Sequence, residues 1–228
     1  MIFYNIKGVV LDLDGTLVSS IKIYDEAHRE FIKRKFNIDI GDGVKLDNSG
    51  APMEELVRSL IEKYKLNVDV RELLKEYEEF FINSGYINKI KFTTGAKEIL
   101  NYFKDKKYKL GLVTSNTRRV TTEILKKLGI FGLFEAVVTR EDIKNPKPDP
   151  DPYLMVLKLI NLSPLEVIAI EDSVYGIISA KRAGLNAIGV ASGVNKKREL
   201  MNAGASMVFK NLKELYDYLI KQDKNNNQ

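Results

Sequence analysis

Short apolar runs alternate with longer amphipathic stretches over most of the chain. A short apolar run bounded by turn residues is typical of a buried strand, and apolar positions spaced three and four residues apart indicate a helix. The strand-like runs are 8–11, 110–113, 136–138, 167–170, 187–190 and 206–209. The helix-like stretches are 95–106, 117–128, 152–161, 173–183, 196–203 and 212–221. This alternation predicts an α/β fold with a Rossmann-like parallel sheet that helices cover on both faces.

Residues at the ends of these stretches carry helix start and stop signals. Thr94 is a candidate N-cap, Asp151-Pro152 reads as an N-cap followed by proline at the first helical position, and Ser163 to Glu166 has capping-box spacing. Gly129 and Gly184 fit positions just past the ends of helices.

One segment lacks strand-like runs. Residues 20–36, 52–65 and 69–83 all have the spacing of amphipathic helices, and glycine-containing turns lie between the first two. We therefore expect a helical insertion that leaves the sheet after residue 18 and returns near Thr93. The predicted organisation is an α/β core of residues 1–18 and 93–228 with an inserted helical cap domain of residues 19–92.

Polar residues follow four of the apolar runs. Asp12-Leu13-Asp14-Gly15-Thr16 comes after the first run, Thr114-Ser115-Asn116 after the second and Glu171-Asp172 after the fourth. Lys147 lies between prolines in the loop 145–150 that follows the third run. Each cluster alone fits an ordinary turn or helix start. Because ligands of open parallel sheets bind at the carboxyl ends of the strands, we expect the four clusters to meet around one ligand.

Asp12 and Asp14 are the most informative pair in the sequence. Residues two apart in a strand point to the same side, so we expect both carboxylates to emerge together where the strand ends. Two close carboxylates repel each other unless a cation or a shared proton compensates. Carboxylate and carbonyl oxygens suit Mg²⁺, and Lys147 supplies a further positive charge.

Composition excludes several kinds of site. The chain has no cysteine, so it has no disulfide, thiol nucleophile or cysteine-bound zinc. Its one histidine, His28, falls on an insertion helix, where we expect a surface or half-buried residue and no catalytic base. The net charge of +5 comes from dispersed lysines and arginines and does not call for nucleic acid. The sequence contains no candidate signal peptide or membrane span, which predicts a soluble cytoplasmic protein with no membrane partner.

On these motifs, the chain resembles the haloacid dehalogenase superfamily, in the branch that includes phosphoglycolate phosphatase and beta-phosphoglucomutase. The four clusters match the four motifs of that family in order, and the helical insertion lies where this branch carries its cap. The resemblance implies a nucleophile, an acid and base, a phosphate-binding hydroxyl and a neutralising cation, which would be Asp12, Asp14, Thr114 and Lys147 respectively. It also implies phosphate-binding donors near Thr114 and in the first motif, at Gly15, Thr16, Ser115 and Asn116.

The resemblance further implies a Mg²⁺ cofactor. Its ligands would be Asp12, the backbone carbonyl of Asp14, and Asp172, with Glu171 a nearby acid. The predicted function is Mg²⁺-dependent hydrolysis of a small phosphorylated metabolite, such as phosphoglycolate or a sugar phosphate, through an aspartyl-phosphate. We expect a monomer or weak homodimer, since all the proposed groups come from one chain.

Three other functions stay open at this point. Phosphotransfer like that of beta-phosphoglucomutase is the nearest, although Tyr24 and Met53 stand where such mutases carry a histidine and an arginine. A non-catalytic phosphoacceptor or binding module belongs to another class and is disfavoured by Asp14 and by the insertion. A nucleic-acid-binding protein is disfavoured by the scattered charge. Substrate specificity is expected from residues 45–55 and 86–91.

Overall fold

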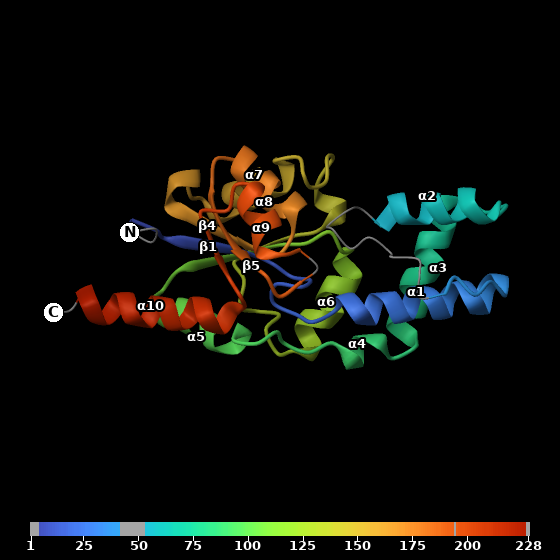
Figure 1. Ribbon diagram of the computed structural model, residues 1–228, viewed down its shortest axis with the longest axis horizontal. Helices are drawn as coiled ribbons and strands as arrows, with labels where there is room; N and C mark the ends of the chain where they lie inside the picture. Colours follow the sequence, from blue (N-terminus) through green and yellow to red (C-terminus); the bar gives the residue numbers. More distant parts are fainter. Residues whose placement is uncertain (1–4, 42–52, 194, 227–228) are drawn as a thin grey trace.

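A parallel sheet of six strands forms the centre of the protein (Figure 1). The computed structural model describes residues 5–41, 53–193 and 195–226. The strands are β1 (Gly8–Asp12), β2 (Lys109–Val113), β3 (Ala136–Val138), β4 (Val167–Glu171), β5 (Asn186–Val190) and β6 (Met207–Phe209). Their order in the sheet is β3-β2-β1-β4-β5-β6, and all neighbours are parallel. The predicted Rossmann-like α/β fold is confirmed, and β1 occupies the middle of the sheet.

Helices cover both faces of the sheet, because successive strand residues point to opposite sides. On β1, Val9 and Leu11 belong to one buried apolar cluster and Val10 belongs to the other. The first cluster includes residues of α5 (Ala96–Asp105), α6 (Arg118–Lys127) and α10 (Leu212–Asn226). The second includes residues of α7 (Asp151–Ile160), α8 (Val174–Arg182) and α9 (Lys197–Asn202), on the opposite face (Figure 1). One-turn 3-10 helices occupy Arg140–Asp142 and Pro164–Glu166.

The helices between residues 21 and 89 extend beyond one end of the sheet (Figure 1). They are α1 (Ile21–Phe36), α2 (Met53–Tyr64), α3 (Val70–Asn83) and the short α4 (Tyr86–Lys89). The sequence pattern predicted the first three of these helices and did not predict α4. The chain passes between them and the sheet twice, and the two passages are hydrogen-bonded to each other. The Ser19 amide donates to the Lys91 carbonyl and the Thr93 amide to the Leu17 carbonyl, both at 2.9 Å. The division at residues 18 and 93 stays a prediction. No helix in the described ranges has both the length and the apolar character that crossing a bilayer requires.

The predictions made for the ends of the helices are partly confirmed. The capping box from Ser163 to Glu166 is present, and Gly129 and Gly184 have the positive φ angles (72° and 86°) of residues past helix ends. The N-cap prediction at Thr94 is wrong, because the cap is Gly95, whose φ is 89°. A Cβ atom there would come within 2.0 Å of the Lys213 amide nitrogen, so the close approach of α10 requires glycine.

Asp151 is also not an N-cap. The helix α7 already includes Asp151, and Pro150 precedes it. The Asp151 carboxylate instead accepts hydrogen bonds from the backbone and side-chain amides of Asn145, at 3.2 and 3.0 Å. Its side chain therefore fixes the beginning of the loop that carries Lys147.

His28 is buried, which corrects the expectation of a surface or half-buried residue. Only 4% of the residue is exposed to solvent, and its ring stacks on that of Tyr77 with the centroids 4.4 Å apart. Neither ring nitrogen has a hydrogen-bond partner among the described residues. Burial lowers the pKa of His28 from 6.5 to about 3, because a charged imidazole would lose its hydration.

Replacement of His28 is expected to reduce the acid sensitivity of the fold. Between pH 6.5 and 3 the unfolded chain binds a proton that the folded chain does not, so His28 lowers stability as the pH falls. In His28→Leu the difference in unfolding free energy between pH 7 and pH 5 should shrink by about 2 kcal/mol. Urea titrations of both proteins at the two pH values measure this difference. An equal pH dependence in wild type and variant would show that His28 is protonated in the folded protein.

Candidate active site

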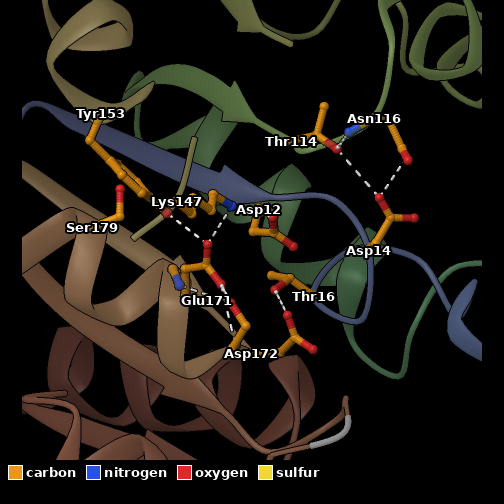
Figure 2. Close-up of polar contacts among 12 residues, drawn as sticks. Asp12, Asp14, Thr16, Thr114, Asn116, Lys147, Tyr153, Glu171, Asp172 and Ser179 are labelled. Atoms are coloured by element: carbon orange, nitrogen blue, oxygen red, sulfur yellow. Dashed lines mark hydrogen bonds and ion pairs between the residues drawn. The ribbon is translucent and has the colours of Figure 1, made fainter. Parts of the chain in front are cut away.

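The carboxyl ends of β1, β2 and β4 bring the predicted polar clusters to one edge of the sheet. Asp12 ends β1, Glu171 ends β4, and Thr114 directly follows β2. Asp12 lies beside Val113 in the register of the sheet, so the end of β1 is flanked by the ends of both neighbouring strands. Figure 2 shows that these side chains and Lys147 gather around the end of β1.

Lys147 is a buried cation between two carboxylates. Its Nζ donates to Asp12 Oδ1 at 2.7 Å and to Glu171 Oε1 at 2.6 Å, and only 4% of the residue is exposed. Burial alone would lower the pKa of Lys147, but the charges of Asp12 and Glu171 outweigh it and raise the pKa. Lys147 is therefore held in its charged form directly against Asp12.

Glu171 makes hydrogen bonds through both of its oxygens. Oε1 accepts from Lys147 and from the hydroxyl of Tyr153 at 2.9 Å, and Oε2 accepts from the amide and hydroxyl of Ser173. A Cβ atom on Gly176 would lie 1.9 Å from this carboxylate, so the first turn of α8 can approach it only with glycine. These contacts hold the Glu171 carboxylate in one position, and that carboxylate in turn orients the ammonium group of Lys147.

Three buried carboxylates lie close enough together to hold one metal ion. Oxygen atoms of Asp12, Glu171 and Asp172 all lie within 4.8 Å of one another. Burial and the charge of Glu171 raise the pKa of Asp12 to about 8, although Lys147 acts in the opposite direction. Burial and the charges of Asp12 and Glu171 raise the pKa of Asp172. Negative charge thus exceeds positive charge at this point, and the all-oxygen donor set fits a hard divalent cation such as Mg²⁺.

Asp14 points away from Asp12, which corrects the expectation that both carboxylates emerge together (Figure 2). Strand β1 ends at Asp12, so the strand alternation does not continue to Asp14. The Asp14 carboxylate accepts hydrogen bonds from Ser20 and Asn116, both at 2.6 Å, and from Thr114 at 3.3 Å. Burial raises the pKa of Asp14 despite these hydrogen bonds. The two aspartates therefore differ in their direct partners, since Asp12 contacts the charged Lys147 whereas hydroxyl and amide groups hold Asp14, although the charge of Asp14 still contributes to raising the pKa of Asp12.

The remaining predicted residues lie around this pair. The Thr16 hydroxyl donates to Asp172 at 3.2 Å. Gly15 has a φ of 83°, and a Cβ atom there would lie 2.1 Å from Asp172 Oδ2, so the turn after β1 needs glycine on both counts. Ser115 and Asn116 line a cavity next to Asp14.

Sequence reasoning missed a fifth loop at the site. Ser192 and Gly193 follow β5, and the Ser192 hydroxyl donates to the Gly15 carbonyl at 2.7 Å. A Cβ atom on Gly193 would lie 1.6 Å from Asp172 Oδ2, so this loop packs tightly against the acidic group. The rule that found the other four clusters, polar residues directly after an apolar strand, applies equally to Ala191-Ser192-Gly193.

Comparison with known sequences identifies the family. Residues 9–190 match the sequence pattern of the family described as haloacid dehalogenase-like hydrolase, and this match covers most of the chain. The chain belongs to the haloacid dehalogenase-like hydrolases. The predicted resemblance is thereby confirmed, and so is the enzyme class, a phosphoric monoester hydrolase of the haloacid dehalogenase type.

Individual relatives of this hydrolase have similar lengths and folds. It is 31% identical to the phosphorylated carbohydrates phosphatase of Thermotoga maritima, over 90% of this chain and 94% of that protein. It is 29% identical to the beta-phosphoglucomutase of Bacillus subtilis, over 82% of this chain and 84% of the relative. The solved structure of a hydrolase from Pseudomonas syringae superposes with a TM-score of 0.79 at 25% identity, covering 94% and 98% of the two chains.

Proposed function

We propose that this hydrolase is a Mg²⁺-dependent phosphatase that cleaves a small organic phosphomonoester through an aspartyl-phosphate on Asp12. The proposal rests on the different contacts of the two aspartates. Asp12 lies against the buried ammonium group of Lys147 at 2.7 Å, whereas hydroxyl and amide groups hold Asp14 apart from it. Such a pair supplies one ionised nucleophile and one carboxyl group that can carry a proton.

In the first step a carboxylate oxygen of Asp12 attacks phosphorus, and the bond between phosphorus and the ester oxygen breaks. Lys147 and the bound cation together would keep Asp12 ionised, since Lys147 alone leaves the pKa of Asp12 at about 8, and both would offset the negative charge of the incoming phosphate. Asp14 gives its proton to the departing alcohol oxygen. Its raised pKa supports this role, because the carboxyl group must be protonated before the step.

In the second step water attacks phosphorus of the aspartyl-phosphate. Asp14, now ionised, accepts a proton from the water, and Asp12 is released as a carboxylate with inorganic phosphate as the product. The phosphoryl oxygens would accept hydrogen bonds from Thr114, Ser115, Asn116 and the turn Gly15-Thr16. Phosphoryl transfer depends mainly on such positioning and charge neutralisation.

Asp12, Asp172 and the backbone carbonyl of Asp14 would hold the magnesium ion, with Glu171 beside them. Bound Mg²⁺ would supply positive charge that offsets the charge of these carboxylates and of the phosphate. Helices α1 to α4 would form the cap domain, and their position beyond the sheet supports a role in enclosing a small phosphorylated metabolite (Figure 1).

Hydrolysis of p-nitrophenyl phosphate tests this proposal. We expect turnover with Mg²⁺ and its loss after chelation with EDTA. Mg²⁺ alone should also raise the melting temperature of the protein, because a bound cation offsets the repulsion among Asp12, Glu171 and Asp172. In Asp172→Asn the affinity for Mg²⁺ should fall by at least about tenfold, since one ligand charge is lost. Both the turnover and the thermal shift should then require correspondingly higher Mg²⁺ concentrations.

Asp105→Asn provides a matched control, because Asp105 is an exposed aspartate at the end of α5. Full turnover in the presence of EDTA would contradict the metal requirement. A thermal shift without any turnover would favour the binding module over the phosphatase.

A further inference from the structure

The loop that carries Lys147 has little regular backbone pairing of its own. Residues 145–150 form neither helix nor strand, and three of the six are prolines, which have no backbone N–H group to donate. Lys147 itself has a flexible four-carbon side chain. Its Nζ nevertheless lies 2.7 Å from Asp12 Oδ1 and 2.6 Å from Glu171 Oε1. The ammonium group can keep both contacts only while the backbone beside it stays in place.

Helix α8 contacts the backbone of the two residues that follow Lys147. The Ser179 hydroxyl, labelled in Figure 2, donates to the Asp149 carbonyl. The Arg182 guanidinium donates to the Pro148 carbonyl at 3.0 Å. Because both acceptors are backbone groups next to Lys147, these two hydrogen bonds attach the loop to α8 at the point where the lysine leaves it.

Ser179 is completely buried within α8. A serine inside a helix commonly donates to a carbonyl of the preceding turn of its own helix, and alanine favours the helix more than serine does. The Ser179 hydroxyl donates instead to a segment outside α8. Its removal would take this donor from the half-buried Asp149 carbonyl, which is costly away from water. The hydroxyl therefore holds the loop and contributes little to the helix itself.

The same side of α8 also holds the carboxylate that faces Lys147. Residues at intervals of three, which are neighbours on a helix surface, form one row along α8 and its N-cap: Ser173, Gly176, Ser179 and Arg182. The Ser173 hydroxyl donates to Glu171 at 2.9 Å, and Gly176 permits the close approach of α8 to that carboxylate. The first half of the row thus contacts Glu171, and the second half contacts the loop of Lys147.

We propose that Ser179 and Arg182 are positioning residues for Lys147, which they hold through the backbone of residues 148 and 149. Helix α8 then fixes the distance between Glu171 and the backbone that carries Lys147, and with it the reach of the ammonium group toward Asp12. Ser179 has the larger effect, because it is buried whereas Arg182 is exposed to water. This inference rests on the proposed phosphatase function and specifies residues that act through Lys147.

Ser179→Ala is expected to lower kcat for p-nitrophenyl phosphate about tenfold, because a displaced ammonium group stabilises the transition state less well. Arg182→Met should lower it about threefold. Thr121→Val is the matched control for the serine, since Thr121 is buried on α6 and its hydroxyl donates within that helix, to the Thr117 carbonyl at 2.8 Å. Lys181→Met, at the exposed neighbour of Arg182, is the control for the arginine. Both controls should keep kcat within about twofold.

The ammonium signal of Lys147 in ¹H–¹⁵N NMR reports the position of the group without any turnover. A buried ammonium group between two carboxylates exchanges its protons slowly with water and should give a separate signal, which Lys147→Met removes. In Ser179→Ala this signal should shift and broaden, whereas in Thr121→Val it should stay unchanged. A role of Ser179 in stability alone would lower the melting temperature and leave the signal in place.

An unchanged ammonium signal or an unchanged kcat in a folded Ser179→Ala protein would overturn this inference and leave the phosphatase proposal intact. The inference would also fail if the wild type gave no separate Lys147 signal, since the ammonium group would then not be held between the two carboxylates. Failure of the wild type to hydrolyse p-nitrophenyl phosphate with Mg²⁺ would overturn the proposed function, whereas a shifted signal in Ser179→Ala would still support the positioning of Lys147 by α8. Thermal melting of each variant checks that it is folded.

Discussion

Asp12→Asn is expected to lose at least about 10⁴-fold in kcat and yet to unfold at a higher temperature than the wild type. Activity is lost because an amide oxygen is a poor nucleophile for phosphorus. Stability rises because the substitution removes one of three carboxylates that lie within 4.8 Å of one another. Burial and the charge of Glu171 raise the pKa of Asp12 to about 8, so the folded protein holds this carboxylate at a cost near neutral pH.

The gain in unfolding free energy should be roughly 2 kcal/mol in the absence of divalent cations. Lys147 keeps Glu171 as a partner at 2.6 Å, so the substitution does not leave the buried ammonium group unpaired. Steady-state kinetics with p-nitrophenyl phosphate and calorimetry in EDTA measure the two effects. Asp105→Asn, at an exposed aspartate on α5, should change neither. Retained activity would show that the nucleophile lies elsewhere, and a lower melting temperature would show that the contact with Lys147 is net stabilising.

Lys147→Met should remove both activity and stability. The substitution leaves Asp12 and Glu171 buried without the cation that now contacts each of them, at 2.7 and 2.6 Å. Removing one partner of a buried ionic group typically destabilises a protein by about 3–5 kcal/mol. The loss in kcat should be at least about 10³-fold, since Lys147 no longer offsets the charge of the incoming phosphate.

Urea titration and hydrolysis of p-nitrophenyl phosphate measure these losses. Lys144→Met, in the same loop but exposed, is the control and should leave both quantities within error. A variant with wild-type stability would indicate that the two carboxylates take up protons when the lysine is absent. Full activity in a folded Lys147→Met protein would contradict the proposed role.

The strands and their carboxyl ends could be predicted because each is a local pattern. An apolar run such as Val167 to Ile170 ends in charged residues, and in a parallel sheet that ending determines where the charged residues lie. Thr114, Lys147 and Asp172 were therefore predicted near Asp12 without knowledge of any contact. The separate orientation of Asp14 could not be predicted this way, because it depends on where β1 ends and on hydrogen bonds from Ser20 and Asn116.

Residues whose role depends on helix packing were harder to predict. Tyr153 lies within the apolar stripe of α7 and looks like an ordinary core residue, although its hydroxyl contacts Glu171. His28 falls one turn after Tyr24 and one turn before Phe31, and this spacing would have indicated its burial. Of the expected specificity ranges, 45–52 lies outside the described residues, Glu54 lines the cavity, and none of 86–91 lines it.

We expect residues 19–92 to be exchangeable as one unit, because the two chain passages between the sheet and the inserted helices are hydrogen-bonded to each other. Leu17 and Thr93 are joined by one backbone hydrogen bond, so the distance between the points where the unit is attached is a few ångströms. We expect that a different segment joined at these two points would leave the order and register of the strands unchanged. Recombination there would then change the helices next to the site, while the groups proposed to act on phosphorus stay on the retained sheet.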